Sequence, residues 1–488
     1  MFRSVTHGIT IFRSVIPAAL LGVPLMACAI QVYEPQPLDP QGIAAELQAR
    51  GGADEGLRAF LARHGRSTQE WPLPDWDLGS LTLMAIYYHP DMEVARAQLR
   101  LRRAAEVTAG QRSNPSINPR VEHHSEEEDF SDSPWSLGFA LELPIEAADR
   151  RAARSARAEA LSEDARLNVA ATAWRIRSRL RTRFVDGFTA ERMAELLRRE
   201  LDARERSLAL LEKRQALGEA SPTEVSIFRI QAQETRLAFN TAEGNIQATR
   251  AALAEALGMP HDAVRRLVIR FDGLERQAPR TPPTAELQEA ALVNRLDIRR
   301  ARARYAAVEA RLREEIAKQY PSFSLSPGFV WDQGDALKSL GAAVLLPLLN
   351  LNEGPIAEAR AARNLENARF TALEARVMGE ISLAVTRSEA AIQAWTTAKG
   401  LVTGQRARLD QVRKLFAFGE ADRLTLVAAE IELVAAERAR LRTRIDALLA
   451  LGAVEDAVQR PLDGGAIPED LEALSGRPAA AGHAGAKT

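Results

Sequence analysis

Few side chains in this sequence are spaced for chemistry. His123 and His124 could bind a cation together with the acidic run that follows them, Glu126, Glu127, Glu128 and Asp129. A hydrated acidic surface loop is the alternative for this stretch. The sequence contains no HExxH, GxSxG or P-loop pattern, and its many glutamates fall on helical faces that water would solvate. We therefore expect no catalytic site, no cofactor and no resident metal, and conclude that the chain is not an enzyme.

The only cysteine, Cys28, follows a short hydrophobic segment. A basic start and an apolar run over residues 1–27 predict an export signal, which is too short for a membrane-spanning helix. The motif Leu25-Met26-Ala27-Cys28 resembles the bacterial lipobox, in which the cysteine is acylated. Cys28 is therefore a candidate palmitoylated lipid anchor of a lipoprotein. Ordinary cleavage at the small residues Ala27-Cys28-Ala29 is the alternative.

Two stretches alternate between apolar and small or polar residues, which predicts two β-hairpins. The strands are expected at about 116–125 and 135–144, and again at about 322–332 and 338–347, with the second turn at 332–338. Each strand has the length of about ten residues that crosses a bilayer core when tilted. The small polar face suits a wet lumen. The other face is expected to meet lipid through Trp135, Leu137, Phe139, Leu141, Phe323, Leu325, Phe329, Trp331, Leu340 and Val344.

The hairpin belongs to a unit that occurs twice. The segments WSLGFALELP at 135–144 and KSLGAAVLLP at 338–347 align, and Gly218-Glu219-Ala220 aligns with Gly419-Glu420-Ala421. Helices are expected at about 81–111, 222–257, 285–318 and from Gly419 to about 451, with one of about 70 residues after each hairpin. The predicted parts are an export signal (1–27), a lipid-anchored tether and equatorial segment (28–78), a first repeat (79–258), an equatorial linker (259–284), a second repeat (285–455) and a C-terminal tail (456–488).

The composition favours helix, and a net charge of −1 gives no reason to expect nucleic acid as a partner. Apolar or small residues recur every seven positions after the first hairpin, as in a coiled coil: Ala173, Leu180, Gly187, Ala194, Leu201 and Leu208. The predicted fold is mostly α, with long antiparallel coiled helices and four strands in each chain. Four strands cannot close a barrel, and open edges in lipid cost several kcal/mol per unpaired group. Several copies must therefore pool their strands. Two copies would give about eight strands, whose interior side chains fill the barrel, whereas three give twelve and more room, so a homotrimer with a twelve-stranded transmembrane β-barrel is expected.

The hairpins ending in Ser-Leu-Gly and Leu-Pro, the Pro-Ser pairs before their first strands, and the two Gly-Glu-Ala turns resemble outer-membrane efflux proteins of the TolC family. The resemblance covers about residues 70–455. It implies a trimeric channel in the outer membrane of a Gram-negative bacterium, standing on a periplasmic α-barrel. Such channels passively conduct substrates that an inner-membrane pump, here of the RND type, delivers through a periplasmic adaptor protein. Residues 76–78 and 350–355 most resemble the branch associated with heavy-metal efflux.

The same resemblance implies roles for the two turns between the coiled helices. They would be periplasmic tips that dock the adaptor, formed by Gly218, Glu219, Ala220, Gly419, Glu420 and Ala421. The residues just after them would line a closed entrance, with the candidate gate residues Glu224, Asp422, Arg423 and Thr425. Thr425 occupies the place that matches Glu224 and departs from the acidic pattern of the family. Threefold symmetry would turn each carboxylate into a ring that favours cations.

Two other functions fit parts of the sequence. The helices alone would allow a periplasmic coiled-coil scaffold lipoprotein without a channel, although the membrane-length hairpins argue against it. A lipid-anchored enzyme would need a reactive polar cluster that the sequence does not contain. The transported substrate is not encoded in any motif, because the pump selects it.

Overall fold

The computed structural model describes residues 32–124, 133–146, 149–276, 280–332, 334–345 and 348–462, and the chain divides into two units, Met1–Leu47 and Gln48–Thr488. In the first unit, residues 32–39 have no regular structure, and helix α1 (Pro40–Ala49) begins there and crosses the division. The predicted export signal and Cys28 lie outside the described residues.

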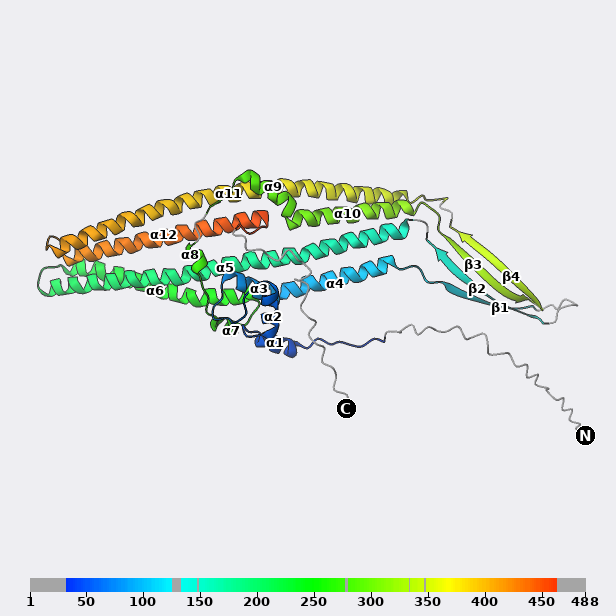
Figure 1. Cartoon of the computed structure of the whole chain (residues 1–488), viewed down its shortest axis with the longest axis horizontal. Helices are drawn as coiled ribbons and strands as arrows, with labels where there is room; N and C mark the ends of the chain where they lie inside the picture. The colour runs from blue at the N-terminus through cyan, green and yellow to red at the C-terminus, as the bar shows by residue number, and fades with distance from the viewer. Residues whose placement is uncertain are drawn as a thin grey trace, which may run out of the picture. The chain divides into compact units, whose positions relative to one another are not determined.

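Two long helices organise the second unit, α5 (Arg150–Ala216) and α11 (Glu353–Ala417) (Figure 1). Their 67 and 65 residues make each about 100 Å long at 1.5 Å per residue. Shorter helices pack along each of them: α4 (Pro90–Gly110) and α6 (Pro222–Leu257) along α5, and α10 (Leu296–Ala317) and α12 (Arg423–Val458) along α11. Helix α5 also packs on α10 and α12, which joins the two repeats.

The seven-residue pattern marks the buried side of α5. Ala173, Leu180, Ala194 and Leu201 are buried, and Gly187 and Leu208 are partly exposed. Ala173 and Leu180 belong to the largest core cluster, whose other members include residues of α3 (Leu78–Tyr88), α6, α12 and α2 (Glu55–Arg63). Trp76 is 1 % exposed in this core and forms a β-bridge with Ile269. The core therefore lies where the short helices meet, part-way along the long ones.

The helix expected over residues 81–111 is broken at His89 into α3 and α4, so that prediction was wrong. Pro90 causes the break, because the residue before a proline avoids the helical region. His89 has φ −65° and ψ 128°, and its Nδ1 accepts a hydrogen bond from the backbone N–H of Asp91 at 3.1 Å. Pro90 then begins α4 as its first residue, where its missing N–H costs nothing.

The helix expected over 285–318 is also broken, at Arg295, into α9 (Thr284–Asn294) and α10. No proline follows Arg295, so the local sequence does not predict this break. The guanidinium of Arg295 donates to Asp297 at 2.7 Å, to Glu380 at 2.9 Å and to the Ala457 carbonyl at 2.7 Å. The contacts with Glu380 and Ala457, which belong to other helices, stabilise the chain at this break. The expected linker likewise contains two short helices, α7 (His261–Arg265) and α8 (Asp272–Arg276), and α12 continues beyond residue 451.

The described strands form one antiparallel sheet in the order β1 (Ser116–His123), β2 (Trp135–Ile145), β3 (Phe323–Asp332) and β4 (Asp335–Val344). The two hairpins are joined by pairing of β2 with β3. The second turn is tighter than the expected 332–338, since Asp332 already pairs with Asp335. Gly334, with φ +114°, permits this short turn. The expectation of a mostly helical chain carrying four antiparallel strands is confirmed.

Candidate functional site

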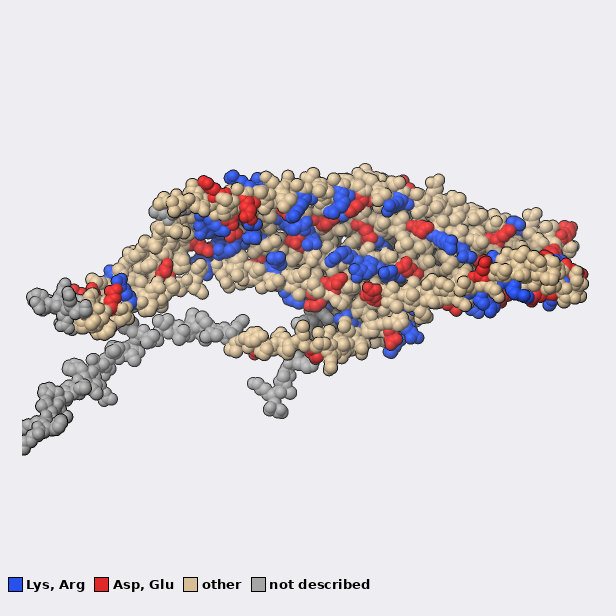
Figure 2. All heavy atoms as spheres, turned by 180° about the vertical axis from the view of Figure 1, so that it is seen from behind, with Lys and Arg blue, Asp and Glu red and all other residues tan. Residues whose placement is uncertain are grey.

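The sheet has one apolar face that crosses all four strands. The register aligns Leu137 with Trp331, Phe139 with Phe329, and Phe323 with Val344. All ten residues predicted to meet lipid lie on this face. Phe139 and Leu340 are 53 % and 75 % exposed, so no other part of the described chain covers them. Figure 2 shows few charged side chains on the sheet compared with the helices.

The opposite face carries mostly small or polar side chains, interrupted by the apolar pair Val330 and Leu337. The small or polar residues are Ser136, Gly138, Ala140, Ser324, Ser326, Gly328, Ser339 and Gly341. Close packing restricts two of these positions, because a Cβ on Gly138 or Gly328 would approach Val330 or Ser339 to 2.8 or 2.7 Å. Four further residues that were not predicted lie on the apolar face, Ile117, Val121, Leu143 and Ile145. Alternation in β1, where Ser116 and Asn118 flank Ile117, was the signal that could have found the first two.

The paired histidines sit at the end of β1 and point to different partners. The ring of His123 packs edge-on against Trp135, with centroids 4.6 Å apart. His124 Nε2 lies 3.0 Å from Ser136 Oγ and 3.6 Å from Asp332, and Ser136 also contacts Asp332. The described residues contain no group of three possible ligands placed to hold a metal ion. The acidic residues Glu126 to Asp129 lie outside the described residues.

Both predicted tips are built in the same way. Gly218 and Gly419 have φ +75° and +76°, which ends the preceding helix in a left-handed residue. The N–H of Glu219 donates to the carbonyl of Arg214 at 2.8 Å, and the N–H of Glu420 to that of Leu415 at 2.9 Å. These bonds satisfy carbonyls at the helix end that would otherwise lack a partner. Each glycine is thus explained by the turn itself.

The candidate gate residues lie at the capped starts of the helices that follow the tips, and one of them, Asp422, is itself the cap of α12. Ser221 Oγ accepts the backbone N–H of Glu224 at 3.1 Å, and Asp422 accepts that of Thr425 at 2.8 Å. Hydrogen bonds from the hydroxyl and backbone N–H of Thr425 lower the pKa of Asp422, and Arg214 lies 3.4 Å from its carboxylate. The Arg214–Asp422 pair links the first tip to the second. Arg423 is the first residue of α12 and is exposed.

An exposed apolar residue precedes each tip glycine, and the sequence analysis did not single it out. Leu217 is 75 % exposed and Phe418 is 80 % exposed. The two residues occupy matching positions in the two repeats, and this match in the sequence could have predicted a shared role. A turn exposing a large apolar side chain beside the exposed Glu219 or Glu420 suits contact with another protein.

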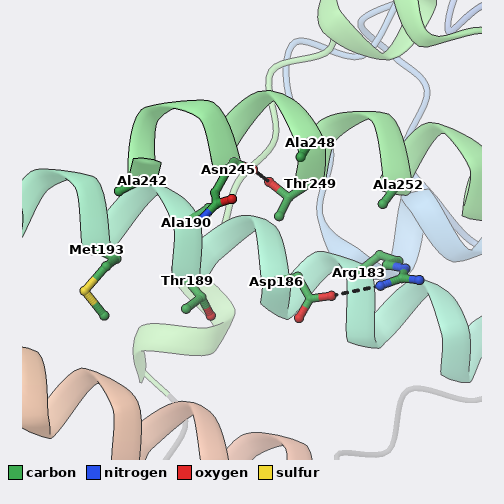
Figure 3. A pocket seen from close by; sticks show the side chains of 10 residues that line it. All are labelled: Arg183, Asp186, Thr189, Ala190, Met193, Ala242, Asn245, Ala248, Thr249 and Ala252. Atoms are coloured by element: carbon green, nitrogen blue, oxygen red, sulfur yellow. Dashed lines mark hydrogen bonds and ion pairs between the residues drawn. The ribbon is translucent and has the colours of Figure 1, made fainter. Parts of the chain in front are cut away.

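A shallow hollow of about 430 Å³ lies between α5 and α6 (Figure 3). Alanines from both helices line it, and Asn245 and Thr249 face it from α6. Arg183 and Asp186 on α5 form an ion pair of 3.3 Å at one side. The small side chains make the hollow a place of close helix approach. It contains no reactive group.

None of the described helices is long and apolar enough to cross a membrane. Ion pairs instead tie the long helices together. Arg177 and Arg181 of α5 both contact Glu455 of α12, and Arg181 also bonds Asp456 at 2.6 Å. Glu455 is 6 % exposed. This buried network fixes the first repeat against the second.

Part of this chain matches a known protein family. Residues 84–259 match the family model described as outer membrane efflux protein. A curated relative, the cobalt-zinc-cadmium resistance protein CzcC of Cupriavidus metallidurans, is 24 % identical over 251 residues. That match covers 51 % of this chain and 59 % of the relative, so it spans less than two thirds of the relative's length.

Solved structures share the fold at low identity. The outer membrane protein VceC of Vibrio cholerae is 21 % identical with a TM-score of 0.63, and the match covers 78 % of this chain and 95 % of VceC. The channel protein CusC is 15 % identical with a TM-score of 0.61, covering 81 % and 95 %. Of these proteins, CusC is described as forming a transmembrane channel. Residues 84–259 are thus similar to the outer membrane efflux protein family, part of the chain is similar to CzcC, and the chain shares the fold of VceC and CusC.

Proposed function

We propose that three copies of this chain pool their strands into one twelve-stranded barrel, which conducts efflux substrates across an outer membrane. The supporting observation is the two-faced sheet: strands of about ten residues carry an apolar face on one side and small polar residues on the other. The outer edges of β1 and β4 have no strand partner within the described chain. In lipid, each of these edges requires a strand partner, and a neighbouring copy of the chain supplies that partner.

Channel activity is tested with purified protein in planar bilayers. Discrete conductance steps, together with heat-sensitive trimers on gels, are expected. A periplasmic scaffold would give neither result, so soluble protein without conductance would contradict the proposal.

The tips are the proposed docking surface for a periplasmic adaptor, which would connect the channel to an inner-membrane pump of the RND type. Leu217 and Phe418 supply apolar anchors, and Glu219 and Glu420 supply the surrounding charge. Glu219→Lys with Glu420→Lys should preserve trimers and weaken crosslinking to the adaptor. Unchanged crosslinking and export would leave the turns without a docking role. Glu224 and Asp422 remain candidates for carboxylate rings at the entrance.

Divalent metal ions are the proposed substrate class. The support is the resemblance to the heavy-metal branch and the relative whose name specifies cobalt, zinc and cadmium. Deleting the gene should sensitise cells to these ions, and restoring it should recover growth. Sensitivity to organic toxicants alone would assign another substrate.

Cys28 is the proposed site of acylation, which would anchor the mature chain to the outer membrane from the periplasmic side. Labelled palmitate should enter the wild-type protein and not Cys28→Ala. An unlabelled wild type would favour ordinary signal cleavage.

A further inference from the structure

A groove of about 580 Å³ between α5, α11 and α12 carries an excess of positive charge. The residues with charge that line it are Arg192, Glu195, Arg199, Lys399, Glu437, Arg440 and Arg444. These are five cations and two carboxylates. Both carboxylates are already paired, Glu195 with Arg192 at 2.9 Å and Glu437 with Arg199 at 2.8 Å.

Trp395 lies beside two of these cations, Lys399 and Arg444, and Arg444 also donates a hydrogen bond to the Leu274 carbonyl. Lys399 Nζ lies 4.8 Å from the centre of the Trp395 ring and Arg444 Cζ lies 5.3 Å from it. Lys399 and Arg440 are exposed, and neither forms an ion pair with a carboxylate in the described ranges. Clustered like charges repel one another, so an acidic ligand would be attracted to this groove.

The chain itself contains an acidic segment directly after α12. Residues 463–474 read DGGAIPEDLEAL, with carboxylates at Asp463, Glu469, Asp470 and Glu472 and no lysine or arginine. The same stretch contains apolar residues that could cover the tryptophan ring. Its charge and composition complement those of the groove.

The end of α12 directs the chain back along the helix. Gln459 is left-handed with φ +51°, and the N–H of Leu462 donates to Glu455 Oε1 at 3.0 Å. Leu462 is therefore level with Glu455. Along α12, Glu455 and Arg444 are about 16 Å apart at 1.5 Å per residue. Residues 463–469 span up to about 23 Å when extended, so Glu469 can reach the groove.

We propose that the acidic segment Glu469–Glu472 of this chain docks into the groove around Trp395 and pairs with Lys399 and Arg440. The groove is then an intramolecular binding site for the C-terminal tail. This inference does not depend on the channel function.

Carbodiimide crosslinking of the full-length protein tests the docking, because it joins a lysine amine directly to a contacting carboxylate. Mass spectrometry should find Lys399 joined to Glu469, Asp470 or Glu472. Lys414, which lies on the same helix nearer the tip, is the internal control and should not be joined to the tail. Equal yields at Lys399 and Lys414, or no product at Lys399, would overturn the proposal.

Charge reversal and isotope mixing complete the test. Arg440→Glu should lower the Lys399 product severalfold, while Arg442→Glu, on the same helix but outside the groove, should not. A synthetic peptide of residues 463–476 should compete with the product, and a scrambled peptide should not. In a mixture of labelled and unlabelled protein, products within one copy support the proposal. Products exclusively between copies, or equal loss in both arginine variants, would contradict it.

Discussion

Gly218 and Gly419 are required by backbone conformation and not by crowding. A Cβ at either position would meet nothing within 4 Å, and both residues have positive φ. Gly218→Ala should therefore destabilise the turn by about 1–2 kcal/mol through backbone strain alone. Faster proteolysis beside Leu217 would measure the effect. Gly404→Ala, with equal space inside α11, is the control and should be neutral or slightly stabilising. Similar cleavage in both variants would refute the strain.

Asp422 should make the second tip sensitive to acid. Its folded-state pKa is lowered mainly by hydrogen bonds from Thr425. The stabilisation is therefore complete above the unfolded pKa and is lost as pH falls through the lower, folded value. The protection of the amides in the first turn of α12 against hydrogen exchange, relative to their intrinsic exchange rates, should fall below about pH 4. Asp422→Ala should exchange fast at neutral pH, and a variant that still shows the acid transition would exclude Asp422 as its source.

Within the sheet, neighbouring residues of β4 face opposite environments. Leu340 is on the apolar face and Gly341 on the small polar one. Arginine at Leu340 should cost about 2–4 kcal/mol if the residue lies near the bilayer midplane. Gly341→Arg should cost less, since a Cβ there makes only an ordinary contact with Ser326 at 3.5 Å. Trimer yield after assembly in lipid measures the difference. Equal losses would mean that the apolar face does not meet lipid.

Between helices, the buried carboxylate of Glu455 should contribute more to the free energy of unfolding than an ion pair on the surface does. Glu455→Leu would leave Arg177, 7 % exposed, without its partner. Removing one member of a buried pair typically costs about 3–5 kcal/mol. Asp410→Leu removes an exposed partner of Arg413 and should cost below about 1 kcal/mol. Thermal unfolding compares the two. Equal shifts would show that the network does not hold α5 against α12.

The local sequence pattern predicted those helices and strands in which the periodic spacing of apolar residues is not interrupted. The bounds of α6, the alternation of β3 and the two tip glycines follow directly from the sequence. The break before Pro90 was readable from the proline, but the matching break at Arg295 was not. It depends on Glu380 and the Ala457 carbonyl, which are distant in sequence and become neighbours only after folding.

The candidate site divides in the same way. The apolar face could be predicted because side-chain direction alternates along a strand. The capping role of Asp422 and its link to Arg214 depend on two tips that lie far apart in sequence. The exposed side chains of Leu217 and Phe418 look like coiled-coil core residues until the turn is seen.

At the scale of the assembled molecule, the trimer requires β1 of one copy to pair with β4 of the next. In the four-stranded order, β1 and β4 run in opposite directions, so that pairing is antiparallel and continues the sheet. Asn118 and Ser339 lie in one row across the sheet, through Ala140 and Gly328. Because closing a barrel shifts the register between edges, neighbouring β4 positions must be tested as well.

Cys28 is the only cysteine, so Cys28→Ala provides a background for disulfide trapping. Asn118→Cys combined in turn with Leu337→Cys, Ser339→Cys and Gly341→Cys should yield disulfide-linked trimers at one register, since a disulfide needs Cβ atoms within about 3.5–4.5 Å. Asn118→Cys with Ala140→Cys, direct partners within one chain, is the control and should close internally without an oligomer. Linked dimers that never proceed to trimers, or monomers at every register, would rule out the threefold barrel.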